Sequence, residues 1–465
     1  MADFSDKVVY QIYPKSFRDT NGDGFGDIPG IIEKLDYLQE LGVDYLWLTP
    51  VFPSPQRDNG YDVADYREIN PLFGTMADLE KLIRQSETRG MGIMLDMVFN
   101  HTSTRHEWFQ KALAGEEKYQ NYYIFREGMP DQAPTNWQSK FGGTAWEYVP
   151  GLKKWYLRLY DVTQADLNWD NPEVREELKE ILRFWKKKGI RAFRFDVINL
   201  VSKPEQMLDD FEGDGRRFYS DGPHIHEYLK ELVRDAGIED FITVGEMSST
   251  TLEHCIRYSS PKEKELSMCF HFHHLKVDYK DGNKWALATL AARSRDNSRT
   301  PMQWSRETCG GFSEAEPWLP MSAGFRDEIT VEAQQKDGDS ILAFYKKLIA
   351  MRKTYPIIAK GEIAFLETEN DMVMAYKRVL GDQQIVVLCN LDGKRQRIKA
   401  DEAWRGLPVL LENGSRTAEN SPSCRNMNPG VPFEKEGPFT GSEEGTWTME
   451  PYEFLVVGNV REEQR

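Results

Sequence analysis

The stretch RAFRFD, residues 191–196, is a short β-like run that ends in the acidic residue Asp196. Four more runs follow the same plan and end in polar or charged groups: VVYQIY (8–13), YLWLTP (45–50), IMLDMVFNH (93–101) and FITVGE (241–246). Amphipathic helical stretches separate these runs, so strand and helix alternate along the chain. Chemistry at the carboxyl end of every strand is typical of a (β/α)₈ barrel. We therefore predict an α/β enzyme built on a TIM barrel.

The composition sets limits on domain number and on partners. A chain of 465 residues with 40% hydrophobic content exceeds one ordinary domain, so two or three domains are expected. The formal net charge of -16 argues against a nucleic-acid partner, because binding a polyanion requires clustered Lys and Arg. We therefore expect a small-molecule substrate and a monomer or weak dimer.

The sequence also predicts a cytoplasmic location. Met1 is followed by ADFSD, without a basic segment or an apolar run, and no later stretch approaches the length of a membrane span. The cysteines are odd in number and widely spaced, which suits a reducing compartment. They are Cys255, Cys269, Cys309, Cys389 and Cys424.

Changes in pattern divide the chain. The first barrel part covers residues 1–101, and an inserted subdomain rich in Trp, Tyr, Asn and Gly covers residues 102–171. The second barrel part covers residues 172–357 and includes a helix from Asp339 to Tyr355. Short alternating strands then predict a C-terminal β-sandwich domain over residues 358–465. Residues 413–444 are expected to form a long loop.

The strand count is too low for a closed barrel. A sixth run, LSMCFHF (266–272), is followed by no apolar run that can serve as strand seven or strand eight. Six parallel strands cannot close a barrel, since strand number, tilt and stagger are linked. Either the fold departs from the usual type, or residues are missing near Leu287 and Ala288.

Two acidic residues end consecutive barrel strands, so the carboxylates of Asp196 and Glu246 are expected to converge. Retaining glycosidases need such a pair at about 5–5.5 Å, one as nucleophile and one as proton donor. Arg194 points to the same face as Asp196 and is expected to keep that carboxylate ionised. Glu246 follows Val244 and Gly245, so we expect it to lie in a drier environment and to hold its proton. The alternative is that both residues form strand-end salt bridges.

Five blocks resemble the conserved motifs of the α-amylase family, in particular its oligo-1,6-glucosidase and trehalose-6-phosphate hydrolase branch. They occur in the family's order along nearly the whole chain: QIYPKSF (11–17), DMVFNH (96–101), RFDVIN (194–199), GEM (245–247) and RDNSRTPMQW (295–304).

The resemblance implies roles for particular residues. Asp196 is the implied nucleophile and Glu246 the implied general acid/base, while His101 and Arg194 contact the glucosyl unit next to the bond that is cleaved. The implied ligands of the non-reducing glucose, which make the pocket blind-ended, are Asp58, Tyr61, Asp62 and Arg299.

One family feature is absent from the sequence. The family carries a third acidic residue in an Asn-His-Asp block on strand seven, and no such triplet occurs in this chain. By the resemblance, roughly 80 to 90 residues with strands seven and eight are missing at about Leu287 and Ala288. We favour a segment left out of the sequence over a true deletion. A chain made without this segment is expected to be inactive.

The first βα loop contains a candidate metal site. DTNGDGFGD (19–27) places oxygen ligands at alternate positions, as the first part of an EF-hand loop does, but Gly30 stands where the bidentate Glu is usual. We expect a structural Ca²⁺ and no organic cofactor, with Mg²⁺ or a solvated acidic turn as the alternatives. The expected ligands are Asp19, Asn21, Asp23, Phe25 through its carbonyl group, and Asp27.

Three stretches resemble the trehalose-6-phosphate hydrolases more than the isomalto-oligosaccharide enzymes: GDGRRFY (213–219), SSTTLEHC (248–255) and FHFHHLKVDY (270–279). A sugar phosphate carries nearly two negative charges and needs local cations in an acidic protein. The candidates are Lys276, which is favoured, and His273, His274, Arg216 and Arg217; each has an ordinary structural role as its alternative.

The sequence thus predicts a retaining α-glucosidase that hydrolyses trehalose 6-phosphate to glucose and glucose 6-phosphate. The alternative within the branch is an oligo-1,6-glucosidase that acts on short α-1,6-gluco-oligosaccharides. A reading from another class is a catalytically silent family member that binds sugar, which the missing third acid favours and the complete set of Asp196, Glu246, Arg194 and His101 opposes.

Overall fold

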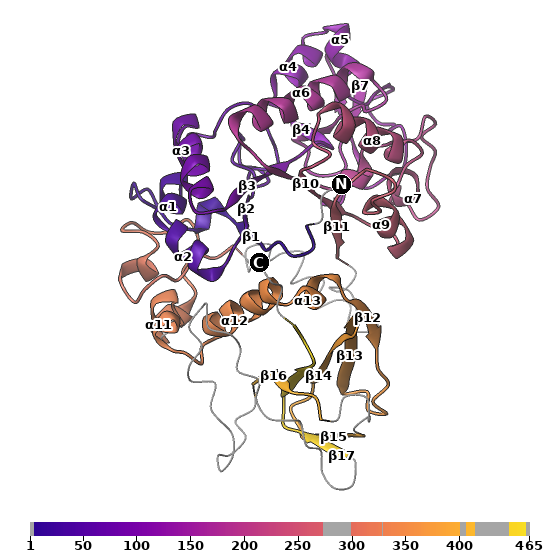
Figure 1. Ribbon diagram of the computed structural model, residues 1–465. Helices are drawn as coiled ribbons and strands as arrows, with labels where there is room; N and C mark the ends of the chain where they lie inside the picture. The colour runs from indigo at the N-terminus through magenta and orange to yellow at the C-terminus, as the bar shows by residue number, and fades with distance from the viewer. Residues whose placement is uncertain (1–3, 273–298, 328, 400–405, 414–445, 462–465) are drawn as a thin grey trace. The chain divides into compact units, whose positions relative to one another are not determined.

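The computed structural model describes residues 4–272, 299–327, 329–399, 406–413 and 446–461 (Figure 1). The chain divides into two compact units, one formed by Met1–Phe4 and Val9–Thr330 and one by Ser5–Val8 and Val331–Arg465. Each unit has its own sheet and its own apolar core. In the described residues, no helix combines the length and the apolar character needed to cross a membrane.

A six-stranded parallel sheet forms the centre of the first unit. Its strands follow the chain order, and neighbouring strands are hydrogen-bonded in parallel. All six predicted runs are therefore strands. They are β1 (Val9–Ile12), β2 (Tyr45–Leu48), β3 (Gly92–Met97), β9 (Ala192–Phe195), β10 (Ile242–Met247) and β11 (Met268–His271).

The sheet is open within the described residues, with β1 and β11 at its two edges. These are the first six strands of the expected eight. The part of the chain in which strands seven and eight were sought, residues 273–298, lies outside the described residues.

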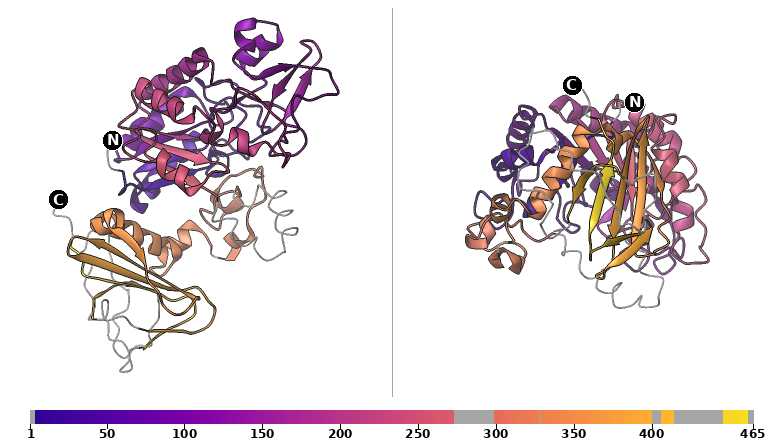
Figure 2. Two further views of the ribbon diagram at one scale, coloured as in Figure 1. Left: turned by 90° about the vertical axis from the view of Figure 1, so that its right-hand side faces the viewer. Right: turned by 60° about the horizontal axis from the view of Figure 1, so that its bottom comes forward.

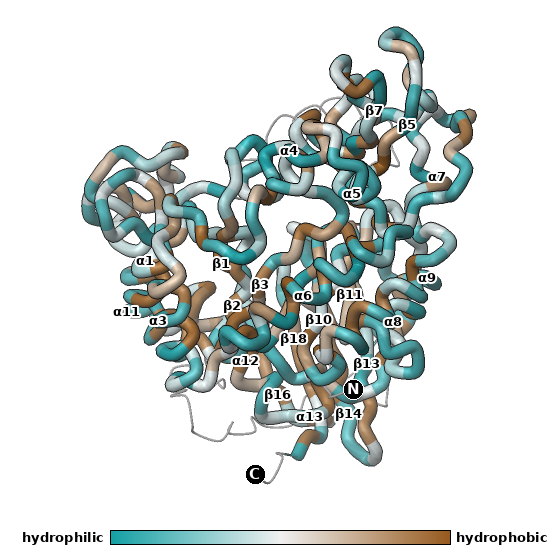
Figure 3. Tube along the Cα trace, turned by 90° about the horizontal axis from the view of Figure 1, so that it is seen from above, coloured by the Kyte–Doolittle hydropathy of each residue, from teal (hydrophilic) through white to brown (hydrophobic). Residues whose placement is uncertain are grey.

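Helices cover the sheet and join consecutive strands (Figures 1 and 3). The longest, α6 (Pro172–Lys188), begins at Asn171, whose side chain accepts a hydrogen bond from the N–H of Glu173, and ends at Gly189 in the left-handed conformation. One face of α6 is buried, including Trp185, which donates to the carbonyl of Tyr66 at 2.8 Å. The other helices are α1 (Ile28–Glu33), α2 (Leu35–Leu41), α3 (Met76–Glu87), α7 (Arg216–Tyr219), α8 (Ile225–Asp235) and α9 (Leu252–Tyr258).

The inserted subdomain follows β3. It holds α4 (Glu107–Leu113), α5 (Glu117–Gln120), the antiparallel pair β4 (His101–Ser103) and β8 (Gln164–Asp166), and a three-stranded sheet of β5 (Phe125–Glu127), β6 (Trp146–Val149) and β7 (Lys154–Leu157). Trp137 and Trp146 are fully buried and Trp155 is nearly so, and all three belong to one apolar cluster. These indoles therefore hold the subdomain together.

The second unit contains an antiparallel five-stranded sheet of β12 (Glu362–Phe365), β13 (Val373–Leu380), β14 (Gln383–Asn390), β18 (Phe454–Gly458) and β16 (Val409–Glu412) (Figure 2). A separate pair joins β15 (Gln396–Lys399) to β17 (Thr446–Met449). The helices of this unit are α11 (Val331–Lys336), α12 (Ile341–Thr354) and α13 (Pro356–Lys360).

The boundary between the units differs from the predicted one. We expected the division near residue 357, with the helix ending at Tyr355 in the barrel, but it falls after Thr330. The reason is packing: Met351, Tyr355 and Ile357 share an apolar cluster with Ile385 and Leu410 of the β-domain. The predicted loop over residues 413–444 lies almost entirely outside the described residues.

Candidate active site

Arg194 on β9 lies at the centre of the site and joins three carboxylates. Its Nη1 atom donates to Asp96 at 2.5 Å and to Asp196 at 2.8 Å, and its Nη2 atom contacts Glu246. The side chain of Arg194 is only 3% exposed. The two predicted catalytic carboxylates therefore face one guanidinium group, at the carboxyl ends of neighbouring strands.

The strand geometry accounts for this convergence. Arg194 and Asp196 are two residues apart, so their side chains point to one face. Asp96 pairs with Arg194 in the β3–β9 register, and Gly245 pairs with Phe195 in the β9–β10 register. After Asp196 the chain turns sharply, because Val197 takes a left-handed conformation with φ of 37° before the 3₁₀ turn Ile198–Leu200. A β-branched residue is strained there, as backbones at functional sites often are.

Asp96 is the anchor of Arg194, and sequence analysis gave it no role. Its Oδ2 atom also accepts hydrogen bonds from the indole of Trp47 at 3.2 Å and the hydroxyl of Tyr61 at 3.1 Å. Burial raises the pKa of Asp96 to about 6; Arg194 opposes this rise and Asp196 adds to it. Burial lowers the pKa of Arg194, but the facing acids, Asp96 first, outweigh burial and hold this pKa above its usual value.

Glu246 lies at the end of β10 and contacts Arg194 of the neighbouring strand. The sequence predicted a dry position in which the carboxyl group holds its proton. The structure gives Glu246 a side chain 13% exposed and a guanidinium neighbour, Arg194. The side chain of Glu246 is thus largely buried and lies against the guanidinium group of Arg194.

His101 is buried and has polar contacts at both ring nitrogens. Its Nδ1 atom lies 3.1 Å from the amide nitrogen of Asn100, and its Nε2 atom lies 3.0 Å from the carbonyl oxygen of Tyr61. Nε2 also lies 3.1 Å from the amide nitrogen of Gln164. Both ring nitrogens of His101 are therefore engaged by neighbouring polar groups.

Lys203 fixes the position of Asn100, the residue that contacts Nδ1 of His101. The ammonium group of Lys203 contacts three oxygens: Oδ1 of Asn100 at 2.7 Å, Oδ2 of Asp166 at 2.8 Å and the carbonyl of Leu200 at 2.6 Å. Asp166 also accepts from Asn100 at 3.0 Å. The side chains of Asn100, Asp166 and Lys203 are all buried. This oxygen cage around Lys203 ties β8 of the inserted subdomain to the turn after Asp196.

The predicted sugar ligands gather beside this network. The amide nitrogen of Gln164 donates to Asp58 and to the carbonyl of Tyr61, each at 3.1 Å. Asp62 accepts from Ser54 and from the backbone N–H groups of residues 57 and 58, so its carboxylate holds its own loop. The guanidinium of Arg299 lies 5.6 Å from the ring centre of Tyr13, just beyond β1.

The first loop folds around its own oxygen atoms. Asp19, 2% exposed, accepts from the backbone N–H groups of Asn21, Gly22 and Gly24, and Asn21 and Asp23 accept from residues two positions later. Asp27 accepts from Gly30 and so begins α1. The glycine in the position of the usual glutamate thus has a helix-capping role. Within the part of the chain that the structure describes, no three His, Cys, Asp or Glu side chains are grouped as metal ligands, so the predicted Ca²⁺ stays a prediction.

Of the predicted phosphate ligands, Arg216 and Arg217 already have carboxylate partners, Asp214 at 3.0 Å and Asp210 at 2.8 Å. Phe211 and Phe218 also flank Arg217. These contacts correspond to the ordinary structural role of a loop pair. Lys276, His273 and His274 lie outside the described residues.

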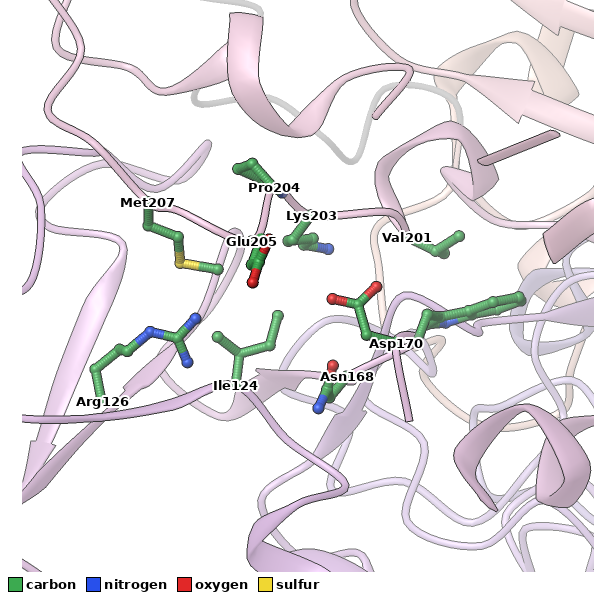
Figure 4. A pocket seen from close by; sticks show the side chains of 10 residues that line it. Ile124, Arg126, Asn168, Asp170, Val201, Lys203, Pro204, Glu205 and Met207 are labelled. Carbon is green, nitrogen blue, oxygen red and sulfur yellow. The ribbon is translucent and has the colours of Figure 1, made fainter. Parts of the chain in front are cut away.

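A separate cavity of about 160 Å³ is lined by Lys203 and by residues of the inserted subdomain (Figure 4). Arg126 and Asp170 point into it, and neither catalytic carboxylate lines it. The chemistry is therefore located by the convergence of Asp96, Arg194, Asp196 and Glu246 and not by the cavity.

Sequence reasoning missed Asp96, Gln164 and Lys203. Asp96 had a usable signal, because a lone acid inside the apolar run of β3 requires a buried partner. Gln164 and Lys203 act across the inserted subdomain, and no local pattern marks such contacts.

Comparison with known proteins agrees with this geometry. The chain matches the α-amylase catalytic domain family over residues 11–293 and 284–361. It is 39% identical to the trehalose-6-phosphate hydrolase of Escherichia coli, over 91% of this chain and 96% of that protein. It is 34% identical to the oligo-1,6-glucosidase of Parageobacillus thermoglucosidasius, over 84% and 91% of the two chains. The crystal structure of the Bacillus licheniformis trehalose-6-phosphate hydrolase superposes with a TM-score of 0.88 at 37% identity, covering 98% of this chain and all of the other.

The alignments are interrupted at the position where the sequence lacks strands. The two family matches meet at residues 284–293. The alignment with the Escherichia coli enzyme is 533 positions long and includes 91% of the 465 residues of this chain, which is about 423 residues. About 110 positions of the alignment therefore have no residue in this chain. The six-stranded parallel sheet belongs to the part of the chain that matches the α-amylase catalytic domain. With family blocks, strand order and site geometry in agreement, the chain belongs to the α-amylase family of glycoside hydrolases.

Proposed function

We propose that this protein is a retaining α-glucosidase whose substrate is trehalose 6-phosphate. One observation carries the proposal: Arg194 brings Asp196 and Glu246 to the two sides of a single guanidinium group. Two relatives named for this activity add the substrate class.

Asp196 and Glu246 have different roles in a double-displacement mechanism. Asp196 attacks the anomeric carbon while Glu246 gives a proton to the leaving oxygen of glucose 6-phosphate. The same Glu246 then takes a proton from water, which releases glucose from Asp196. Arg194, held by Asp96, orients the nucleophile, and His101 contacts the glucosyl unit.

The experiment compares hydrolysis of trehalose 6-phosphate with hydrolysis of isomaltose. A strong preference for the phosphorylated disaccharide is expected. A preference for isomaltose overturns the substrate assignment in favour of an oligo-1,6-glucosidase, for which relatives at 34% identity or less are the support.

A catalytically silent sugar-binding protein is the second candidate, because the Asn-His-Asp block is absent from the 465 residues. The intact mass of the protein isolated from cells separates the two. A mass well above 53.9 kDa means that the natural chain carries the additional segment and supports the hydrolase. A mass of 53.9 kDa together with no turnover supports the silent protein.

We also propose a structural Ca²⁺ at the first loop, held by side-chain oxygens of Asp19, Asn21, Asp23 and Asp27 and the carbonyl of Phe25. Bound there, the ion orders the turn before α1. The buried Asp19 and the nested turns support this assignment. A cytoplasmic location and a monomer or weak dimer complete the proposal; four free thiols in the described residues and a phosphorylated substrate support the location.

A further inference from the structure

We infer that Asn199 is a positioning residue, which ties the turn after Asp196 to the chain that follows Glu246 and so sets the spacing of these two carboxylates. The inference rests on the proposed function, because it takes Asp196 as the nucleophile and Glu246 as the acid/base of the double displacement. Sequence analysis gave Asn199 no role.

The side chain of Asn199 holds one residue by its backbone in both directions. Its Oδ1 atom accepts a hydrogen bond from the N–H of Ser248 at 2.8 Å, and its Nδ2 atom donates to the carbonyl of Ser248 at 2.9 Å. Two such bonds to one residue are what a paired strand provides in a sheet. Asn199 is fully buried, so both bonds are made away from solvent.

Both ends of this contact are close in sequence to a catalytic carboxylate. Asn199 lies three residues after Asp196, in the 3₁₀ turn Ile198–Leu200. Ser248 lies two residues after Glu246, just beyond the end of β10. The backbone pairing of β9 with β10 extends to Phe195 and Gly245. The side chain of Asn199 is therefore a further link between the two strands, on the other side of the carboxylates.

Asp221 fixes the orientation of Asn199. Its carboxylate accepts hydrogen bonds from Nδ2 of Asn199 at 3.1 Å, from the hydroxyl of Thr250 at 2.8 Å and from the hydroxyl of Tyr258 on α9 at 2.7 Å. The N–H of Asp221 donates to the carbonyl of Asn199 at 2.9 Å. The amide of Asn199 has one orientation, because its nitrogen faces two acceptors and its oxygen faces the N–H of Ser248.

The chain that follows Glu246 needs this support. Ser249 takes a left-handed conformation with φ of 57°, which is strained for a residue other than glycine. Asn199 holds the residue before Ser249, and Asp221 holds the residue after it. Loss of the Asn199 side chain should let this turn relax and move Glu246. A displacement of about 1 Å in a catalytic group can lower the rate about 100-fold.

A displaced acid/base has a selective effect on the reaction. Protonation by Glu246 matters most when the leaving oxygen belongs to a sugar, and such general acid catalysis contributes about 10²–10⁴-fold. A nitrophenolate is a stable anion, so its departure needs little protonation. The value of kcat/KM reports the step in which the leaving group departs. Comparing the two kinds of substrate therefore separates the placement of Glu246 from a general effect on folding.

The experiment measures kcat/KM for trehalose 6-phosphate and for 4-nitrophenyl α-glucoside with the same preparation of full-length protein. Asn199→Ala is expected to lower the value for trehalose 6-phosphate about 10- to 100-fold and the value for the nitrophenyl glucoside less than about threefold. The folded fraction of the preparation cancels in the ratio of the two values. Equal losses on both substrates, or no loss on either, overturn the inference.

Asn136→Ala is the matched control, because Asn136 holds Asp210 in the same way, accepting from its N–H at 2.8 Å and donating to its carbonyl at 2.7 Å. The ratio of the two kcat/KM values should be that of the wild-type protein. A selective loss in this control as large as that in Asn199→Ala overturns the inference, because loosening any loop then has the same effect.

Asn199→Ser is the second variant if Asn199→Ala does not fold, since its hydroxyl leaves a polar group for the buried partners. The same selective loss is expected, and an unchanged ratio overturns the inference. A wild-type protein that prefers isomaltose refutes the proposed substrate instead. The ratio taken with isomaltose in place of trehalose 6-phosphate then decides the role of Asn199, because the leaving oxygen of isomaltose also belongs to a sugar.

Discussion

Arg194 and Asp196 are neighbours on one face of β9, and Nη1 of Arg194 donates to Oδ1 of Asp196 at 2.8 Å. A nucleophilic carboxylate must point at the anomeric carbon. The guanidinium group fixes the direction of Asp196, because Asp96 holds the guanidinium from the neighbouring strand. The nucleophile is therefore oriented by a rigid pair and not by a flexible loop.

Asp196→Asn is expected to lower the rate of trehalose 6-phosphate hydrolysis by about 10⁴-fold or more, because an amide cannot form the covalent glucosyl intermediate. The shape and hydrogen-bonding capacity of the side chain are nearly retained, so the far-ultraviolet circular dichroism spectrum should not change. Hydrolysis at the wild-type rate would refute the assignment of the nucleophile.

The stability of the protein should depend on pH through Asp96. The pKa of Asp96 is raised by burial from 3.8 to about 6, so the folded protein binds a proton more tightly than the unfolded chain. This contribution to stability is fully present below about pH 4 and is lost as the pH rises through 6, by up to about 3 kcal/mol.

Asp96→Asn removes that titration. The stability of the wild-type protein relative to the variant should therefore fall between pH 4 and pH 7, measured as free energies of unfolding in urea at each pH. A difference that is constant with pH would contradict the raised pKa of Asp96.

Lys203→Met is expected to destabilise the first unit by about 3–5 kcal/mol, because it leaves the carboxylate of Asp166 buried without its cation. Catalysis should suffer as well, since Asn100 loses the partner that orients it against His101. Thermal unfolding and hydrolysis assays measure the two effects. The double variant Lys203→Met, Asp166→Asn removes both charges and should recover part of the stability; no recovery would contradict the charge argument.

Calcium should stabilise the protein through the first loop. When free Ca²⁺ is about 100 times the dissociation constant, binding contributes about 2.7 kcal/mol. Asp23→Ala should abolish the rise in melting temperature that Ca²⁺ causes. Asp65→Ala is the matched control, because Asp65 is also exposed and makes the same kind of local turn bond, to the N–H of Arg67. An equal calcium response in both variants would place the ion elsewhere.

The strands and helices could be predicted from the sequence, because each has a periodic pattern of apolar residues. The six strand runs and the helices between them appear as predicted, because apolar periodicity acts within a few residues. The spacing of two between Arg194 and Asp196 likewise determined that they share a face. The unit boundary was misplaced because it depends on packing of α12 and α13 against distant strands.

The details of the site were harder to predict. The contact of Glu246 with Arg194 joins adjacent strands, so the neighbours of Glu246 in sequence do not indicate it. The complete burial of Trp137 and Trp146 likewise depends on how the inserted subdomain folds.

The oxygen cage around Lys203 has a consequence for how strongly the inserted subdomain is attached. The ammonium group of Lys203 joins Asn100 to Asp166. Because this group is part of the polypeptide, neither a chelator nor dilution removes it. Treatment with a chelating agent should therefore report on the loop at Asp19 alone and leave the attachment of the subdomain intact.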